Sequence, residues 1–427
     1  MPAIEHEQVL PTDQERDELG WSALHSAASR GLTDTEQRLI ESGGKEVLLA
    51  VDAEGATALH HAAHHGHVDV VQLLAEAGGR ELLFAKSLAG HSALHLAASR
   101  GLAEAARVLA AAGGKELVLA VAANGWTALH YAANRGHGAV VQLLAEAGGR
   151  EVLLAKSLEG QSALHLAAVK GHAEAARVLS AAAGKELVLA VAANGRTALY
   201  LAADFGHGAV VQLLVEAGGR EVLFANSLDG LSALHLAASN GNLEAARVLA
   251  AAGGKELVLA SDPEGHTALH VAAHRRHVEA AGCIIEVGGM ELLHATDNQG
   301  QTALHWAARK GQLETSRALA GSGGKRLLAV KDGQGLTAED RARAAGHGEL
   351  ALMLLLSRLG KGRADVRGQV GPCVSAQEAA LAVEKADAAM AALLAEESEA
   401  SKDGAAEVAS GSKSGKKDNG GGSKKWK

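Results

Sequence analysis

A segment that begins with glycine recurs ten times in this 427-residue chain, at a constant step of 35 residues. After the glycine come one variable residue, a serine or threonine and an alanine, and in nine of the ten copies a leucine follows. We number the copies 1 to 10 by these glycines: Gly20, Gly55, Gly90, Gly125, Gly160, Gly195, Gly230, Gly265, Gly300 and Gly335. Repetition at this length is typical of solenoids, in which each unit is too small to bury its own apolar face and packs on its neighbours. We therefore expect one elongated array rather than several globular domains.

Copy 2 shows the secondary structure that we expect of every copy. Thr57 is a preferred helix N-cap, so a short helix is predicted from Ala58 to Gly66, where glycine favours the left-handed end of a helix. A second helix follows over HVDVVQLLAEAG, because its apolar residues recur at helical spacing. A Gly-Gly pair ends that helix, and an extended or single-turn segment returns the chain to the next glycine. Each copy is predicted to be helix, turn, helix and loop.

This pattern resembles the ankyrin repeat, whose signature T-P-L-H-x-A occurs in a unit of about 33 residues. The resemblance extends from Leu19 to about Gly360 and implies an all-α helix-turn-helix-loop solenoid that binds protein partners. The chain departs from the family in two ways. Alanine replaces the proline in every copy, and two extra residues follow the second helix, which disfavours the usual β-hairpin loop. The family's aspartate three residues before the glycine is kept in five copies: Asp17, Asp52, Asp262, Asp297 and Asp332.

The segments outside the array differ from it in composition. An acidic N-terminal segment covers residues 1–19, and the repeats cover residues 20–360. A linker over 361–374 leads to an acidic, Ala-rich helix over 375–400, which Ser375 and Glu378 open as a capping box. Residues 401–427 are rich in Lys, Gly and Ser, so we expect them to be disordered.

Bulk composition excludes several classes of protein. The formal charge is −8 with a pI near 6.3, which argues against a protein built for nucleic acid. Aromatic residues make up 2% of the chain, so the core must consist of Ala, Leu and Val in closely packed helices. The two cysteines, Cys283 and Cys373, match no disulfide framework and no metal spacing. A polar, acidic start and the lack of a long apolar run argue against secretion and against a membrane partner. We expect an intracellular protein, in the cytoplasm first, with the nucleus as the alternative.

No catalytic motif accompanies the repeats. The chain has no phosphate-binding glycine loop and no nucleophile elbow, and no pair of acids is set apart by its place in the repeat. The sequence therefore predicts no enzyme activity, no cofactor and no metal.

Most of the 22 histidines have a structural explanation. Eight follow the Ala-Leu pair, three residues after the N-cap, where a side chain can bond back to the cap; the resemblance implies that they also bond the neighbouring loop as clips. These are His25, His60, His95, His130, His165, His235, His270 and His305. If they are buried and neutral, their pKa values lie below the usual value near 6.5. Six others start the second helix, where the family also favours histidine: His67, His137, His172, His207, His277 and His347.

Five histidines lie within residues 60–67, and pairs of them stand four residues apart as zinc ligands can. The repeat already explains His60 and His67, and no third-element ligand is identifiable for His61, His64 and His65. A metal-dependent activity at this cluster is the alternative to a binding role.

The positions that vary between copies are the candidate binding residues. By resemblance, the family binds partners through loop tips and the exposed face of the first helices. One variable position follows the leading glycine and contributes Trp21, His91, Trp126, Arg196 and His266, with the two tryptophans expected to be exposed anchors. The other immediately precedes the inter-helix glycine, and we call it the basic row. It contributes Arg30, His65, Arg100, Arg135, Lys170, Phe205, Arg275 and Lys310.

Two interpretations of the basic row stand side by side. The row could attract an acidic, extended protein on a concave face, or its cations could simply favour the negative end of the helix dipole. Nucleic-acid binding by the same row is a further alternative. The sequence favours a non-catalytic scaffold or adaptor that binds a protein. Arg276, which replaces the inter-helix glycine in copy 8, predicts a slightly deformed repeat there.

Overall fold

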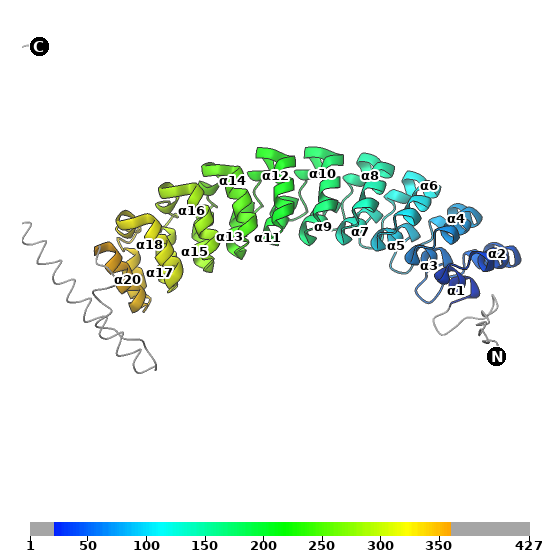
Figure 1. Cartoon of the computed structure of the whole chain (residues 1–427), viewed down its shortest axis with the longest axis horizontal. Coiled ribbons are helices and arrows are strands. Elements are labelled where there is room, and N and C mark those ends of the chain that lie inside the picture. The colour runs from blue at the N-terminus through cyan, green and yellow to red at the C-terminus, as the bar shows by residue number, and fades with distance from the viewer. Residues whose placement is uncertain (1–20, 360–427) are drawn as a thin grey trace, which may run out of the picture. The chain divides into compact units, whose positions relative to one another are not determined.

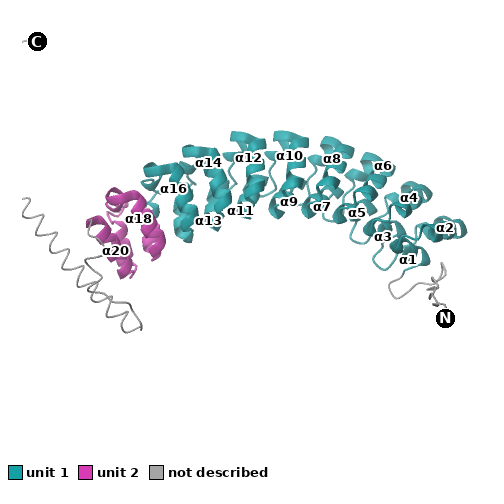
Figure 2. Cartoon of the chain, in the orientation of Figure 1, with its two compact units in different colours: residues 1–303 teal, residues 304–427 magenta. Residues whose placement is uncertain are grey.

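A computed structural model describes residues 21–359, so the segments predicted over 1–19, 361–374, 375–400 and 401–427 lie outside the described residues. Two compact units divide the chain, and the division follows Ala303 (Figure 2). The described part of both units consists of helices and loops without a named strand, which confirms the predicted all-α class.

The first unit repeats a short and a long helix. The short first helices are α1 (Ala23–Arg30), α3 (Ala58–His65), α5 (Ala93–Arg100), α7 (Ala128–Arg135), α9 (Ala163–Lys170), α11 (Ala198–Asp204), α13 (Ala233–Asn240) and α15 (Ala268–Arg275). The long second helices are α2 (Thr33–Leu48), α4 (Val68–Leu83), α6 (Ala103–Leu119), α8 (Gly138–Leu153), α10 (Ala173–Val188), α12 (Gly208–Leu223), α14 (Leu243–Leu259) and α16 (Val278–Leu293).

Like helices stack on like helices in this unit. Each first helix contacts the next first helix, as α5 contacts α7, and each second helix contacts the next second helix, as α6 contacts α8. The unit is therefore a curved double layer, with the first helices on its concave side (Figures 1 and 2). The Ala-Leu pair of every first helix is buried, as are valines and leucines such as Val71 and Leu74 of the second helix. The core is made of small and aliphatic side chains, as the low aromatic content predicts.

The second unit contains α17 (Ala303–Arg309) except for its first residue, α18 (Leu313–Leu328), α19 (Ala338–Ala344) and α20 (Gly348–Leu359). Here Asp340 takes the place of the clip histidine, and its Oδ2 accepts hydrogen bonds from the Thr337 amide at 2.9 Å and from the Thr337 hydroxyl at 2.7 Å. Arg341 pairs with the buried Asp332 at 2.5 Å. Charged groups thus replace the neutral clip in copy 10, as expected of a terminal repeat.

The two residues that lengthen each copy extend the second helix. In α4, Gly79 has φ 55° and ψ −150°, so the regular helix is interrupted there, and one further helical turn runs to Leu83. The expected single-turn segment is confirmed. The loop that follows keeps a tight turn, in which the Ser87 amide donates to the His91 carbonyl at 2.9 Å. Isolated bridges such as Val121 with Thr127 are the remnant of a hairpin.

The inter-helix glycine has two reasons to be glycine. Gly101 has φ 75°, and a Cβ placed on it would lie 2.5 Å from Nδ1 of His137 in the next copy. Arg276 adopts the same conformation with φ 71° and ψ 26°, at a cost of about 1 kcal/mol. The predicted deformation of copy 8 is nevertheless wrong, because α15 keeps the usual length and the Arg276 amide bonds the last carbonyls as glycine does in α7.

Candidate functional site

The clip histidines connect each copy to the next. His60 Nδ1 accepts from the Thr57 amide at 3.1 Å and meets the Thr57 hydroxyl at 2.9 Å. Its Nε2 donates to the His91 carbonyl, 31 residues later, at 2.9 Å. The same forward bond is made by His25, His95, His130, His165, His235 and His270 in the first unit and by His305 in the second. The predicted capping and clip roles are confirmed.

Burial keeps the clips neutral. It lowers the pKa of His60 to about 4, and it does the same for His95, His130, His165 and His270. The pKa of His235 is lowered for the same reason. Because a neutral imidazole whose Nδ1 accepts an amide hydrogen bond must carry its proton on Nε2, each clip has one defined tautomer.

A second histidine ladder runs in the opposite direction. His67, at the start of α4, donates from Nε2 to the Ser29 carbonyl of the preceding copy at 2.9 Å. His137, His172, His207 and His277 make the same backward bond. Sequence reasoning placed these residues correctly but missed the bond; its signal was their constant position one residue after the inter-helix glycine.

The histidines of residues 60–67 do not gather into a metal site. His61 Nε2 lies 2.8 Å from Asp52 Oδ2, and His64 Nε2 accepts from Arg100 Nε at 2.8 Å. With His60 and His67 bonded to carbonyls, the nitrogens point toward different partners. Among the described residues, three ligand atoms approach one another only at Asp262, Glu264 and His266. There Asp262 Oδ1 already accepts the amides of the other two residues, which makes the cluster a loop turn.

The basic row lies at the end of each first helix and is exposed throughout. Within the first unit it contains Arg30, His65, Arg100, Arg135, Lys170, Phe205, Asn240 and Arg275, and Lys310 is exposed in the second unit. Because successive first helices are in contact, the basic residues from copy 1 to copy 5 form one uninterrupted line. Burial and neighbouring basic groups lower the pKa of His65 in copy 2, so the permanent cations of the line are the arginines and Lys170.

The residues that follow the leading glycine are not exposed anchors. The Trp126 ring lies 5.0 Å from Tyr131 between centroids, and His91 Nε2 lies 2.9 Å from the Tyr131 hydroxyl. The Trp21 ring packs 4.4 Å from His61. The expectation of exposed tryptophans is wrong, because both rings are half-buried against aromatic neighbours.

Arg196 and His266 at the same position are also engaged within the protein. The Arg196 guanidinium lies 5.1 Å from the centre of the Tyr200 ring and 3.9 Å from Asp204. His266 Nδ1 lies 2.9 Å from Asp262 Oδ2. The structure therefore separates the two variable positions: one packs within the loops, and the other faces solvent.

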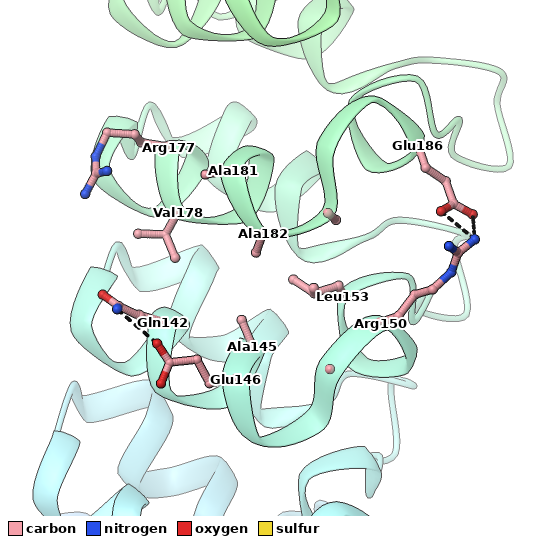
Figure 3. A pocket seen from close by; sticks show the side chains of 12 residues that line it. Gln142, Ala145, Glu146, Arg150, Leu153, Arg177, Val178, Ala181, Ala182 and Glu186 are labelled. Atoms are coloured by element: carbon pink, nitrogen blue, oxygen red, sulfur yellow. Dashed lines mark hydrogen bonds and ion pairs between the residues drawn. The ribbon is translucent and has the colours of Figure 1, made fainter.

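Cations on the second helices are paired with acids. Arg150 lies 2.6 Å from Glu186 of the next copy (Figure 3). Five further pairs repeat this contact: Arg80–Glu116, Lys115–Glu151, Lys185–Glu221, Arg220–Glu256 and Lys255–Glu291. The pocket between α8 and α10 in Figure 3 lies beside this ladder, and its Gln142 and Glu146 bond each other. We call these contacts the second-helix ion pairs; sequence reasoning missed them, although a K/R-E pair recurs at the 35-residue step.

Cations of the basic row have no such acid. No carboxylate of the described residues lies within ion-pair distance of Arg30, Arg100, Arg135, Lys170 or Arg275. Arg100 instead donates to the imidazole of His64, whose pKa is lowered by burial and by the Arg100 charge. The positive charge of the row is therefore uncompensated.

Copy 6 lacks both the basic residue of the row and the clip histidine. Tyr200 replaces the clip histidine and is buried, and its amide donates to the Thr197 hydroxyl at 3.3 Å. Asp204 and Phe205 stand at the end of α11, and Phe205 is 55% exposed. An acid at this end opposes the helix dipole, yet the helix forms, so a cation is not required to end a first helix here.

Comparison with known proteins agrees with the repeat geometry. A model of three ankyrin repeats matches residues 5–82, 79–154, 149–224, 219–290 and 234–332. No curated protein matches the chain. None of the helices described has the length and apolar character needed to span a bilayer. On its repeated helix pairs, its histidine clips and these matches, the chain belongs to the ankyrin repeat family.

Proposed function

We propose that this chain is a non-catalytic scaffold that binds a protein partner on the concave side of its first unit. An extended, acidic segment of the partner lies along the basic row. Ankyrin repeats generally act as protein–protein interaction modules, which supports binding as the role. The observation that carries the choice of an acidic partner is the missing counter-charge: second-helix cations have glutamates in place, and basic-row cations have none.

The length of the uninterrupted row sets the length of the partner segment. From Arg30 to Lys170 the row crosses four copy-to-copy steps. Packed helices lie about 10 Å apart, so the row is roughly 40 Å long. An extended chain covers that distance with about 12 residues. A segment of this length with acids at regular intervals is the expected ligand.

The test reverses the charge of three adjacent row residues, Arg100, Arg135 and Lys170, by changing each to glutamate. A labelled peptide of about 12 residues with alternating Glu and Ser is titrated, and its fluorescence anisotropy is measured. We expect the affinity to fall by at least about 100-fold, since each close charge pair is lost and replaced by repulsion.

A matched control reverses three paired cations of the second helices, Lys115, Arg150 and Lys185, by the same change to glutamate. The net charge changes equally, but the row is intact, so the affinity should stay within about threefold. An equal loss in both variants would show that only overall charge matters, and the proposal would be wrong.

Two further features of the proposal can be checked with the same protein. Single-stranded RNA and duplex DNA should bind more weakly than the peptide at physiological salt, because acidic side chains elsewhere on the array repel a continuous polyanion. We also propose an intracellular location, since two cysteines in 427 residues suit a reducing compartment.

A further inference from the structure

A groove opens beside the basic row between copies 2 and 4. It is lined by His64 of α3, by Leu96, Ser99 and Arg100 of α5, by Arg135 of α7 and by His137 at the start of α8. The two guanidiniums come from successive helices that contact each other. Although each arginine ends a different helix, the two charges therefore lie at the same groove.

The groove contains bases and no acid. None of its lining residues is Asp or Glu, and the nearest acid along the chain, Glu104, pairs with Arg107 at 3.4 Å. Ser99 offers a carbonyl, but His137 Nε2 already occupies it at 3.1 Å. The Ser99 carbonyl at the groove is thus satisfied within the protein, whereas the guanidiniums at the rim have no carboxylate of the described residues within ion-pair distance.

His64 holds Arg100 in the absence of a ligand. Both Nε and Nη2 of Arg100 point at His64 Nε2. An imidazole nitrogen that accepts these bonds carries no proton, so this contact orients the guanidinium without neutralising its charge. A ligand with oxygen acceptors could replace the imidazole at the same donors.

We infer that this groove binds a phosphorylated side chain of the partner segment, with Arg100 and Arg135 holding the phosphate oxygens. The inference rests on the proposed function, because the phosphate arrives on a segment that follows the basic row. A phosphomonoester carries close to two negative charges and three acceptor oxygens. Two planar guanidiniums match that charge and can each donate two parallel hydrogen bonds, which a single carboxylate would satisfy only in part.

The position is specific to this pair of copies. Within the first unit the row has adjacent arginines only here: Arg30 is followed by His65, and Lys170 is followed by Phe205. A lysine ammonium is a point charge and does not impose the two-oxygen geometry of a guanidinium. The preferred phosphate position is therefore near the middle of the bound segment.

The test compares three peptides of about 12 residues that are identical except for the central residue, which is phosphoserine, glutamate or serine. With the full chain, we expect the phosphoserine peptide to bind at least about tenfold more tightly than the glutamate peptide. The double variant Arg100→Lys with Arg135→Lys keeps the charge and loses the fork geometry. It should reduce the preference to about twofold while leaving the glutamate peptide within about threefold.

A control makes the same change at two arginines of the second-helix ion pairs, Arg150→Lys with Arg220→Lys, and should keep the tenfold preference. An NMR titration of the His64 ring gives a second readout, because His64 lines the groove with Arg100, Arg135 and His137, and a phosphate bound there should raise the His64 pKa. The other basic groups that act on His64 are His61 and His65 of its own helix. A purely structural role of the arginines would leave the His64 pKa unchanged on peptide addition.

The outcomes separate this inference from the proposed function. Equal binding of the phosphoserine and glutamate peptides leaves the acidic scaffold standing and overturns the phosphate site. An unchanged preference in the double lysine variant also overturns it. Tighter binding of single-stranded RNA than of the phosphopeptide would place the phosphate on a nucleic acid, contrary to the inference. If no peptide binds, the proposed function fails as well.

Discussion

Copies 2 to 5 and copy 6 share the same helices and buried apolar residues, which we call the frame, but they differ in polar residues. In copies 2 to 5 the first helix ends in a base and its histidine bonds the next loop; in copy 6 the helix ends in Asp204 and Phe205, and Tyr200 replaces the clip. Yet Leu199 and Ala203 are as fully buried as their counterparts in the other copies. The comparison teaches that apolar packing and turn glycines make the frame. The clip histidine adds stability to the contact between two copies, and the exposed row residue is not needed for the frame.

Lowering the pH should reduce the folding stability of the copies that have a clip histidine, and this is the largest effect that we expect. The folded pKa of a clip such as His130 is about 4, below the unfolded value near 6.5, so the folded state binds fewer protons. The stabilisation is complete above about pH 6.5 and is lost as pH falls toward 4. At about pH 5.5 each clip loses roughly 1 kcal/mol, and several clips act together.

Thermal unfolding at about pH 7.5 and 5.5 tests this directly, with a large fall in melting temperature expected at the lower pH. Hydrogen exchange resolves the comparison by copy. After correction for intrinsic rates, α7 and α9 should lose more protection in acid than α11, where no histidine occupies the clip position. An unchanged melting temperature would contradict the prediction.

Copy 1 differs from the other copies in its core, where it buries an acid in place of an apolar residue. Glu36 of α2 has 0% exposure, and both of its carboxylate oxygens lack a hydrogen-bond partner. Val71 and Val141 occupy the same position in other copies. Burial raises the Glu36 pKa from 4.5 to about 8. The folded state therefore holds the proton, and stability falls as pH rises from about 4.5 to 8. Glu36→Val should raise the unfolding free energy of copy 1 by about 3 kcal/mol at neutral pH.

Hydrogen exchange of α1 and α2 measures this gain, and the slope against pH should flatten in the variant. Glu46→Gln, which neutralises an exposed acid on the same helix, is the control and should change stability by less than about 0.5 kcal/mol. Lower protection of α2 in Glu36→Val would show that the carboxyl has a partner role that its burial does not reveal.

The sequence was sufficient for the frame because the frame is local. A period of 35 residues, an N-cap hydroxyl and a C-terminal glycine each act within one copy, so the helices and the bond of each clip histidine to its own N-cap could be predicted. The forward bond to the next copy was expected only from the resemblance to ankyrin repeats. The Glu36 anomaly was also visible, since comparison with Val71 at the equivalent position would have shown it.

What the sequence did not predict depends on contacts between copies. The backward bond of His67 and the Arg150–Glu186 pair join residues 38 and 36 positions apart, and only the stacking geometry brings them together. The same limit explains the error at Trp21: its position in the repeat was known, but its ring packs against His61 of the next copy. The phosphate groove likewise arises from two helices that the sequence places 35 residues apart.

Removing one clip should cost less than acid or the buried carboxyl. His130→Ala loses the bond to the Gln161 carbonyl and leaves the Thr127 amide without its acceptor, so we expect about 2 kcal/mol of destabilisation. In copy 6, Tyr200→Phe removes only a hydroxyl and should cost less than about 1 kcal/mol. Urea unfolding followed by hydrogen exchange at α7 and α11 gives both values. Equal costs would mean that the clip contributes packing alone.

Extending the row into copy 6 should give the smallest effect and the sharpest test of its function. Phe205→Arg continues the line of cations past Lys170. Since the gain comes from one exposed charge pair, we expect an acidic peptide long enough to reach copy 6 to bind about threefold more tightly at low salt. A peptide that ends at Lys170 should show no gain, and Phe205→Ala gives the baseline without the ring. If Phe205→Arg weakened the longer peptide, the ring itself would be the contact, and the partner would carry an apolar residue where the row of charges ends.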